Sequence, residues 1–279
     1  MSYRTILVHL TDERRLPAML EAAIPIALCD KARLIGLAVL PPIIIVPDME
    51  GVAGTAIEEH RVAYRAQMNR IRDAFVAATK ARGVDAAWEE LDGQEVNPFG
   101  TVATVVVDRA RAADLILAGQ ANPSWAMSGM LDVGEQLVTE SGRPILLVPK
   151  TGALSGSTKR VLVAWNGSRE SARAVFDAIP LLAAAEQVLV TRLDPDGKAE
   201  QPGADICAAI ARHGVKCEAL QPQRLVTGVG SALLSIAKEQ SADLLVMGCY
   251  GHSRLREFIL GGATRYVLDH MTLPVLMSH

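Results

Sequence analysis

The chain is 279 residues long, 50% hydrophobic and 21% charged, with a formal net charge of −3. This is the composition of a globular protein with enough apolar mass for one large or two ordinary domains. Without a basic excess, binding to nucleic acid or to an anionic membrane surface through charge is excluded. The most apolar stretch, residues 34–47, is broken by prolines and is too short to span a bilayer.

From the N-terminus, residues 5–10 (TILVHL) form an apolar run typical of a buried strand, and the run returns at 160–165 (RVLVAW). Three more stretches recur in the same order, at offsets of 155, 129 and 130 residues: 22–28 at 177–183, 111–120 at 240–249, and 142–150 at 272–279. The chain is therefore predicted to be a tandem duplication. Because the offset falls once, the first copy should carry an insertion, which we expect within residues 41–60.

The expected domains are 1–150 and 160–279, joined by a small, polar linker at 151–159. A long helix is expected in the first copy. Four of its residues recur at helical spacing and are predicted to face the core: Met68, Ile71, Phe75 and Ala78.

The second copy alternates short apolar runs with helical patterns. Strands are expected at 160–165, 187–193, 216–221, 243–249 and 274–278, and helices at 169–185, 203–214, 229–242 and 256–270. Continuous apolar strands separated by helices indicate a parallel sheet covered on both faces. The predicted fold class is α/β: two tandem open, doubly wound, Rossmann-like sheets of five parallel strands flanked by helices, packed as an intramolecular pseudo-dimer. Pairing of 145–148 with 275–278 would cover an apolar edge.

The four cysteines, Cys29, Cys207, Cys217 and Cys249, form no C-x-x-C pair. The first residues hold a strand-like run followed by charges, without the apolar region of a signal peptide. We therefore expect free thiols and a cytoplasmic protein.

Residues 248–262 (GCYGHSRLREFILGG) place glycines at both ends of a helix-friendly stretch. Gly248 closes the expected strand 243–249, Gly251 follows it, and Gly261 and Gly262 come near the start of the last helix. Open α/β sheets bind ligands at the carboxyl ends of their strands, and unpaired backbone N–H groups there make a phosphate site. A tight turn explains any single glycine equally well, but the whole set favours a ligand.

The spacing Gly248-x2-Gly251-x9-Gly261 resembles the glycine motif that universal stress proteins carry after their fourth strand. The tandem layout, both strand starts and both P-V/I-L endings add to the resemblance, which covers essentially the whole chain. It implies a stress-response protein that binds ATP or another adenine nucleotide, and it is compatible with bound Mg²⁺. It is also compatible with a homodimer and with an unidentified regulatory protein partner.

The resemblance further implies which residues of the second copy would contact the nucleotide. Backbone N–H groups of the glycine loop would hold the phosphates, with Arg254 as a charged donor, and the ends of three strands would surround the adenosine. The implied nucleotide-binding residues are Ala164, Asn166, Val190, Met247, Gly248, Gly251, Arg254, Gly261, Gly262, Ala263 and Thr264.

Two positions of the second copy depart from the family pattern. Asn166 stands where Asp is usual, which changes the hydrogen-bond pattern at the adenosine. Gly262 stands where Ser or Thr is usual, which keeps the backbone N–H but removes a hydroxyl, and Thr264 is a candidate replacement. Both changes lower the expected affinity for ATP.

The first copy departs further from that pattern. Gly119 is present, but Asn122 and Pro123 follow it, and no glycine pair comes at the right distance. Proline also removes a backbone donor. We interpret the first copy as a degenerate half that has lost the phosphate loop, with Asp12 at the acidic position and with either an empty pocket or a different small ligand.

No catalytic constellation accompanies the loop. A nucleophile elbow, a Walker lysine and paired carboxylates are absent, and Ser168 is interpreted as a helix N-cap. The protein is not expected to be an enzyme, and any ATP hydrolysis should be slow and incidental. Cys249, His252 and His279 are too loosely spaced to predict a metal site.

Two functions remain open. One is a nucleotide-dependent stress-response regulator. The other is a nucleotide-independent interaction module of the same fold, which Asn166 and Gly262 favour and the intact glycine spacing opposes.

Overall fold

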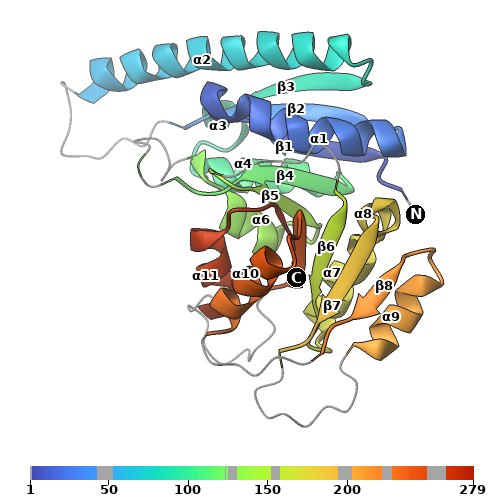
Figure 1. Ribbon diagram of the computed structural model, residues 1–279. Helices are drawn as coiled ribbons and strands as arrows, with labels where there is room; N and C mark the ends of the chain where they lie inside the picture. Colours follow the sequence, from blue (N-terminus) through green and yellow to red (C-terminus); the bar gives the residue numbers. More distant parts are fainter. Residues whose placement is uncertain are drawn as a thin grey trace. The chain divides into compact units, whose positions relative to one another are not determined.

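The computed structural model describes residues 2–42, 53–122, 124, 131–151, 158–193, 203–221, 228–249 and 262–279. Contacts divide the chain into two compact units, of which the first is Tyr3–Ser141 and the second contains Gly142–His279. Both are α/β units, coloured from blue to green and from green to red in Figure 1.

The first unit has a parallel sheet with the strand order β3-β2-β1-β4. The chain leaves β1 on one side to form β2 and β3, and then returns to the other side of β1 to form β4. Its elements are β1 (Thr5–His9), the 3-10 helix η1 (Glu13–Arg15), α1 (Leu16–Asp30), β2 (Arg33–Leu40), α2 (Ala53–Ala81), β3 (Ala86–Asp92), α3 (Gly93–Val96), α4 (Val102–Ala110), β4 (Leu115–Gly119) and α6 (Gly134–Glu140).

Helices cover both faces of this sheet, as its continuous apolar strands require. On one face, Trp88 of β3 contacts Phe75 of α2, with ring centroids 5.7 Å apart. The glycine at position 36 of β2 leaves room for this pair, because a Cβ there would lie 2.9 Å from the Trp88 ring. On the other face, Glu89 accepts two hydrogen bonds from Arg109 of α4, at 2.5 and 2.6 Å.

The helix α2 accounts for part of the extra length of the first copy. It has 29 residues, whereas the helix at the matching place in the second copy has eight. The core periodicity predicted for it is confirmed at Met68, Ile71 and Phe75, which are fully buried, while Ala78 is partly exposed. The predicted insertion at 41–60 includes the first residues of α2, and residues 43–52 lie outside the described part of the chain.

The second unit has the strand order β5-β10-β9-β6-β7-β8. All its pairs are parallel except β5 with β10. Its elements are β5 (Ile145–Val148), β6 (Arg160–Ala164), α7 (Arg169–Asp177), α8 (Ile179–Ala184), β7 (Gln187–Thr191), α9 (Ala204–Ala211), β8 (Cys217–Ala219), α10 (Val229–Glu239), β9 (Leu244–Gly248), α11 (Gly262–His270) and β10 (Val275–Ser278).

The predicted pairing of the two final strands is confirmed. Leu146 of β5 lies opposite Leu276 of β10, and the pair is antiparallel. The last strand of the first copy therefore belongs to the sheet of the second unit, where its buried apolar side chains join the core. The tandem α/β fold with parallel, doubly wound strands is confirmed as well.

One predicted helix is interrupted. Residues 169–185 form α7 and α8, which are separated at Ala178. Pro180 has no backbone N–H to donate and its ring crowds the preceding turn, so the helix restarts there. The predicted N-cap is confirmed, because the Ser168 hydroxyl accepts a hydrogen bond from the Ser171 N–H at 3.1 Å.

The expectation of free thiols is wrong for two cysteines. Cys207 of α9 and Cys217 of β8 form a disulfide, with Cα atoms 5.5 Å apart. Gly214, at φ +81°, turns the chain between them so that the strand runs back along the helix. Cys29 is a free, exposed thiol and Cys249 a free, buried one. None of the described helices is long and apolar enough to span a membrane.

Candidate functional site

The strand order of the second unit reverses between β6 and β9. From β6 the chain moves outward through β7 to β8, and then returns to the opposite side of β6. Open α/β sheets bind ligands at such a reversal, outside the carboxyl ends of the strands. Ala164 at the end of β6 lies in register with Met247 of β9 and with Thr191 of β7. The structure thus brings the strand-end residues of the predicted site together.

The loop after β6 is shaped by its own polar side chains. The Asn166 Oδ1 accepts a hydrogen bond from the Ser168 N–H at 3.0 Å, and Gly167 adopts φ +74°. This Asx turn and the Ser168 cap start α7 immediately beyond the strand. Asn166 is exposed, as a ligand contact requires, but its side-chain oxygen already has a partner.

Gly248 is a glycine because α7 lies directly against the end of β9. A Cβ at this position would lie 2.5 Å from the carbonyl carbon of Glu170, and nearer still to the backbone nitrogen of Ser171. Both helix residues are buried, at 8% and 2% exposure. Close approach of a helix backbone therefore explains Gly248 without a ligand.

A buried negative charge accompanies this contact. The pKa of Glu170 lies below its ordinary value. The largest cause is a hydrogen bond from its own backbone N–H, to which Ser168 and Arg169 add, and burial opposes this effect. Burial, and then the charge of Glu170, raises the pKa of the Cys249 thiol. The thiol donates a hydrogen bond to the Ser278 carbonyl at 3.2 Å, so Cys249 is a packed, unreactive group.

The start of α11 forms the other side of the site. Gly262 is exposed, and a Cβ there would meet none of the described residues within 4 Å. The Ala263 carbonyl lies against Gly230 of α10, where a Cβ would approach it to 2.7 Å, so the two helices pack closely. Thr264 is only 3% exposed. Its side chain is therefore buried within the second unit.

The two apolar residues expected to cover the base are buried. Val190 is fully buried and Met247 is 4% exposed. Gly203, at φ +95°, lies over Val190 so closely that a Cβ would be 2.8 Å from its Cγ1. These residues shape the floor of the site. Gly251, Arg254 and Gly261 lie outside the described residues, as does His252, and within the described part no group of His, Cys, Asp or Glu could hold a metal ion.

Two hydroxyls at this edge were not singled out from the sequence. The Thr191 Oγ1 and the Ser278 Oγ are buried and have no hydrogen-bond partner in the described part of the chain. Thr191 lies in register with Ala164, and Ser278 with Gly248. Each ends a strand next to a predicted site residue, which is the only signal that could have identified them.

The corresponding edge of the first unit is occupied by its own side chains. A Cβ on Gly119, at the end of β4, would lie 2.5 Å from the Arg15 guanidinium, which donates a hydrogen bond to the Gln120 carbonyl at 2.5 Å. Burial lowers the pKa of Arg15, and Asp132 and Asp12 oppose that effect. The Arg15 guanidinium thus covers the end of β4, whereas helix backbone covers the corresponding end of β9.

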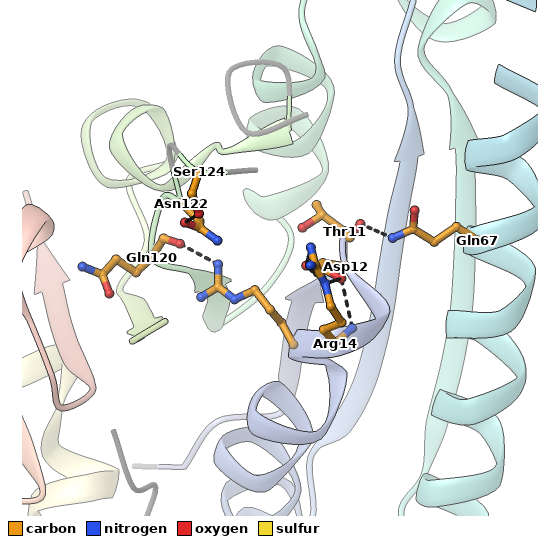
Figure 2. A network of polar contacts seen from close by, with 8 residues as sticks. Thr11, Asp12, Arg14, Gln67, Gln120, Asn122 and Ser124 are labelled. Carbon is orange, nitrogen blue, oxygen red and sulfur yellow. Dashed lines mark hydrogen bonds and ion pairs between the residues drawn. The ribbon is translucent and has the colours of Figure 1, made fainter. Parts of the chain in front are cut away.

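Asp12, which we interpret as the acidic position of the first copy, is engaged internally. Figure 2 shows its carboxylate paired with Arg14, whose Nη2 lies 2.8 Å from Oδ2. Burial alone would raise the pKa of Asp12, but the hydrogen bonds and charge of Arg14 bring it below its ordinary value. Nearby, Gln67 of α2 donates to the Thr11 carbonyl at 3.3 Å.

Asn122 stands where the second copy has Gly251, and its polar groups serve the first unit itself. Its N–H donates to Asp132 at 3.1 Å, and its Oδ1 accepts from Ser124 at 2.7 Å. Burial raises the pKa of Asp132. Pro123 lies outside the described residues.

Residues 157–279 match the model of the universal stress protein family. The universal stress protein Slr1230 of Synechocystis sp. is 26% identical over 220 residues, which are 76% of this chain and 74% of that protein. The crystal structure of a universal stress protein from Archaeoglobus fulgidus has a TM-score of 0.71 at 16% identity, covering 98% of this chain and 95% of that one, and shares the fold. A universal stress protein solved in complex with cAMP covers 53% of this chain and 98% of its own, with a TM-score of 0.36 and 21% identity.

Proposed function

We propose that this protein, whose residues 157–279 belong to the universal stress protein family, binds an adenine nucleotide at the β6–β9 edge of its second unit, with ATP as the first candidate. The reversal of strand order between β6 and β9 carries the proposal, because Ala164 at the end of β6 lies there in register with Met247 of β9. The nucleotide-bound and free forms would then differ in their affinity for a regulatory protein partner.

The chemistry of the edge supports a phosphate ligand. The first N–H groups of the nine-residue helix α11 have no partner within the helix, and none of the described residues lies within 4 Å of a Cβ built at Gly262. Asn166 keeps its amide N–H donors for an acceptor on the sugar or base, since its oxygen is bonded to the Ser168 N–H. The asparagine is therefore compatible with adenosine, although it cannot replace every bond of an aspartate.

One observation favours the alternative, a nucleotide-independent regulatory module of the same fold. The backbone of Glu170 lies against Gly248, its charge acts on the neighbouring Cys249 thiol, and its pKa below the ordinary value keeps the carboxylate ionised at neutral pH. A negative charge at this edge opposes phosphate groups. ATP affinity should therefore be modest.

Ligand binding to the purified full chain decides between the two functions. Mass spectrometry of molecules released by denaturation, followed by calorimetric titration with ATP with and without Mg²⁺, should show one nucleotide per chain. Gly251→Val should abolish binding, whereas Asn122→Val, at the matching position of the first copy, should leave it unchanged. Folded protein that releases no nucleotide and binds none at millimolar ATP would support the nucleotide-independent module.

We propose that ATP is a ligand of this protein and not a substrate. Hydrolysis requires a positioned water or base and a metal clamp for the phosphates, and neither is assigned among the residues of the proposed site. Phosphate release in the presence of saturating ATP should therefore be slower than nucleotide dissociation. Release that is fast and depends on a residue of this edge would contradict the proposal.

A further inference from the structure

The disulfide of the second unit joins two short elements at the end of its sheet. The helix α9 has eight residues, and β8 has three and occupies the end of the strand order. Figure 1 shows the two side by side in orange. Cys207 of α9 and Cys217 of β8 are each half-buried, so the bond is within reach of small molecules in solution.

These elements hold one side of the proposed nucleotide site. Ala219 of β8 lies in register with Val190 of β7, and Gly203, immediately before α9, lies against both residues. A Cβ on Gly203 would be 2.8 Å from Val190 and 3.8 Å from Ala219. The placement of α9 on β8 thus fixes the segment that covers Val190.

We propose that Cys207 and Cys217 form a reversible thiol–disulfide site, which reacts with small disulfides such as glutathione disulfide and, when oxidised, clamps α9 onto β8. In reducing compartments protein disulfides are mainly transient or redox-sensing, whereas in oxidising ones they persist. A pair that ties down two elements too short to be stable alone changes local order when it opens. The effect of this opening on the nucleotide site rests on the proposed function, whereas the thiol chemistry is independent of it.

The reaction balances with glutathione disulfide as the oxidant. The thiolate of one cysteine attacks a sulfur of glutathione disulfide, which forms a mixed disulfide and releases one glutathione thiolate. The second cysteine loses its proton and attacks the protein sulfur of the mixed disulfide, which closes the Cys207–Cys217 bond and releases the second glutathione. Two protein thiols are oxidised by two electrons, and one glutathione disulfide is reduced to two glutathione molecules.

The other two cysteines provide internal controls. Cys29 is an exposed, unpaired thiol in the first unit, and Cys249 is buried with its pKa raised. Cys29→Ser removes the accessible thiol that would otherwise form a mixed disulfide. In this background three cysteines remain, and closure of the proposed pair should leave one thiol available to alkylation after denaturation.

The experiment equilibrates the Cys29→Ser protein in glutathione buffers of graded potential, counts thiols by alkylation and intact mass, and follows amide hydrogen exchange. We expect three thiols in reducing buffer and one in oxidising buffer. Exchange within 204–219 should be roughly tenfold faster in the reduced form, in the lower part of the range that a cross-link of this loop length gives. The doubly substituted C207S/C217S protein should resemble the reduced form in every buffer.

Two results would overturn the proposal. A thiol count that stays the same across all buffers would show that the pair is not reversible, and equal exchange in both forms would show that the bond clamps nothing. ATP titration of both forms then tests the consequence, for which we expect several-fold weaker binding when the pair is reduced. If neither form binds ATP while the thiol count and exchange change as expected, the redox site stands and the proposed function fails.

Discussion

The glycine that ends β4 in the first unit faces a guanidinium, whereas the glycine that ends β9 in the second faces the backbone of a helix. The residues responsible are Arg15 and Glu170, and the offset of 155 residues that relates the first strands of the two copies relates these two positions as well. The duplicated position therefore lies against the corresponding glycine through its side chain in the first unit and through its backbone in the second. A Cβ would crowd its surroundings at this glycine in both units, but the duplicated position carries a cation in the first unit and an anion in the second.

The largest expected effect comes from adding one methyl group at each glycine. Gly248→Ala should lower the free energy of unfolding by about 3 kcal/mol, because the new Cβ meets helix backbone that cannot move aside. Gly119→Ala should cost about 1 kcal/mol, since the Arg15 guanidinium at the end of a flexible side chain can shift.

Urea denaturation of both variants measures these losses, and combining Gly119→Ala with Arg15→Ala provides the control. The alanine at position 119 should cost less in the Arg15→Ala background than in the natural chain. Equal losses for the two glycine variants would show that the environments are equally rigid.

Removal of the cation should have the next largest effect. Arg15→Ala should cost about 2 kcal/mol at pH 7, because it removes a charged hydrogen bond to the Gln120 carbonyl and a cation near Asp132. Burial raises the folded-state pKa of Asp132, so its stabilising contribution is present at low pH and is lost as the pH rises through that value. Without Arg15 this pKa rises further, and the loss at pH 7 grows.

The loss caused by Arg15→Ala should therefore be smaller near pH 4 than at pH 7. Arg15→Gln keeps a hydrogen-bond donor without the charge, and it isolates the electrostatic part. A loss that does not change with pH in either variant would show that Asp132 is not coupled to Arg15.

Periodicity and repetition predicted most of the fold. The offsets of the repeated runs located both sheets, and the matching apolar endings predicted the β5–β10 pair. The break at Pro180 was missed because the apolar pattern continues through it on both sides. The disulfide was missed because Cys207 and Cys217 are ten residues apart in no known motif, and only the return of β8 along α9 brings them together.

The site was predictable where it depends on strand ends and not where it depends on packing. Ala164 and Gly248 end neighbouring strands, and Ala164 lies in register with Met247. The sequence could not show that the Glu170 backbone and the Arg15 guanidinium lie against glycines, because charged residues near a helix start are usually solvated. The role of Thr264 depends on helix rotation, and the structure buries it.

The capping of α7 gives a smaller test of the same edge. Ser168→Ala should lower the free energy of unfolding by about 1 kcal/mol, because the Ser171 N–H loses its acceptor beside Gly248. The matched variant is Ser231→Ala at the start of α10, where the hydroxyl donates to the Gly228 carbonyl and caps no N–H group. A loss as large in Ser231→Ala would show that the cap itself contributes little. Urea denaturation of both proteins measures the difference.

The smallest effect is expected for Glu170→Gln, at about 0.5 kcal/mol at pH 7, the scale of a carboxylate at a helix N-terminus. Its folded-state pKa is lowered, so its stabilising contribution is present above the ordinary pKa of a glutamate and is lost as the pH falls through the folded value. The cost of Glu170→Gln should accordingly vanish in acid. Denaturation series from pH 3 to pH 7 measure this cost beside that of Arg15→Gln.

Both costs should shrink toward low pH, but for opposite reasons. In the second unit acid protonates Glu170 itself. In the first unit acid protonates Asp132, whose negative charge the Arg15 guanidinium offsets. A cost of Glu170→Gln that persists at pH 3 would mean that Glu170 acts through packing, and its charge would then be no obstacle to phosphate at the β6–β9 edge.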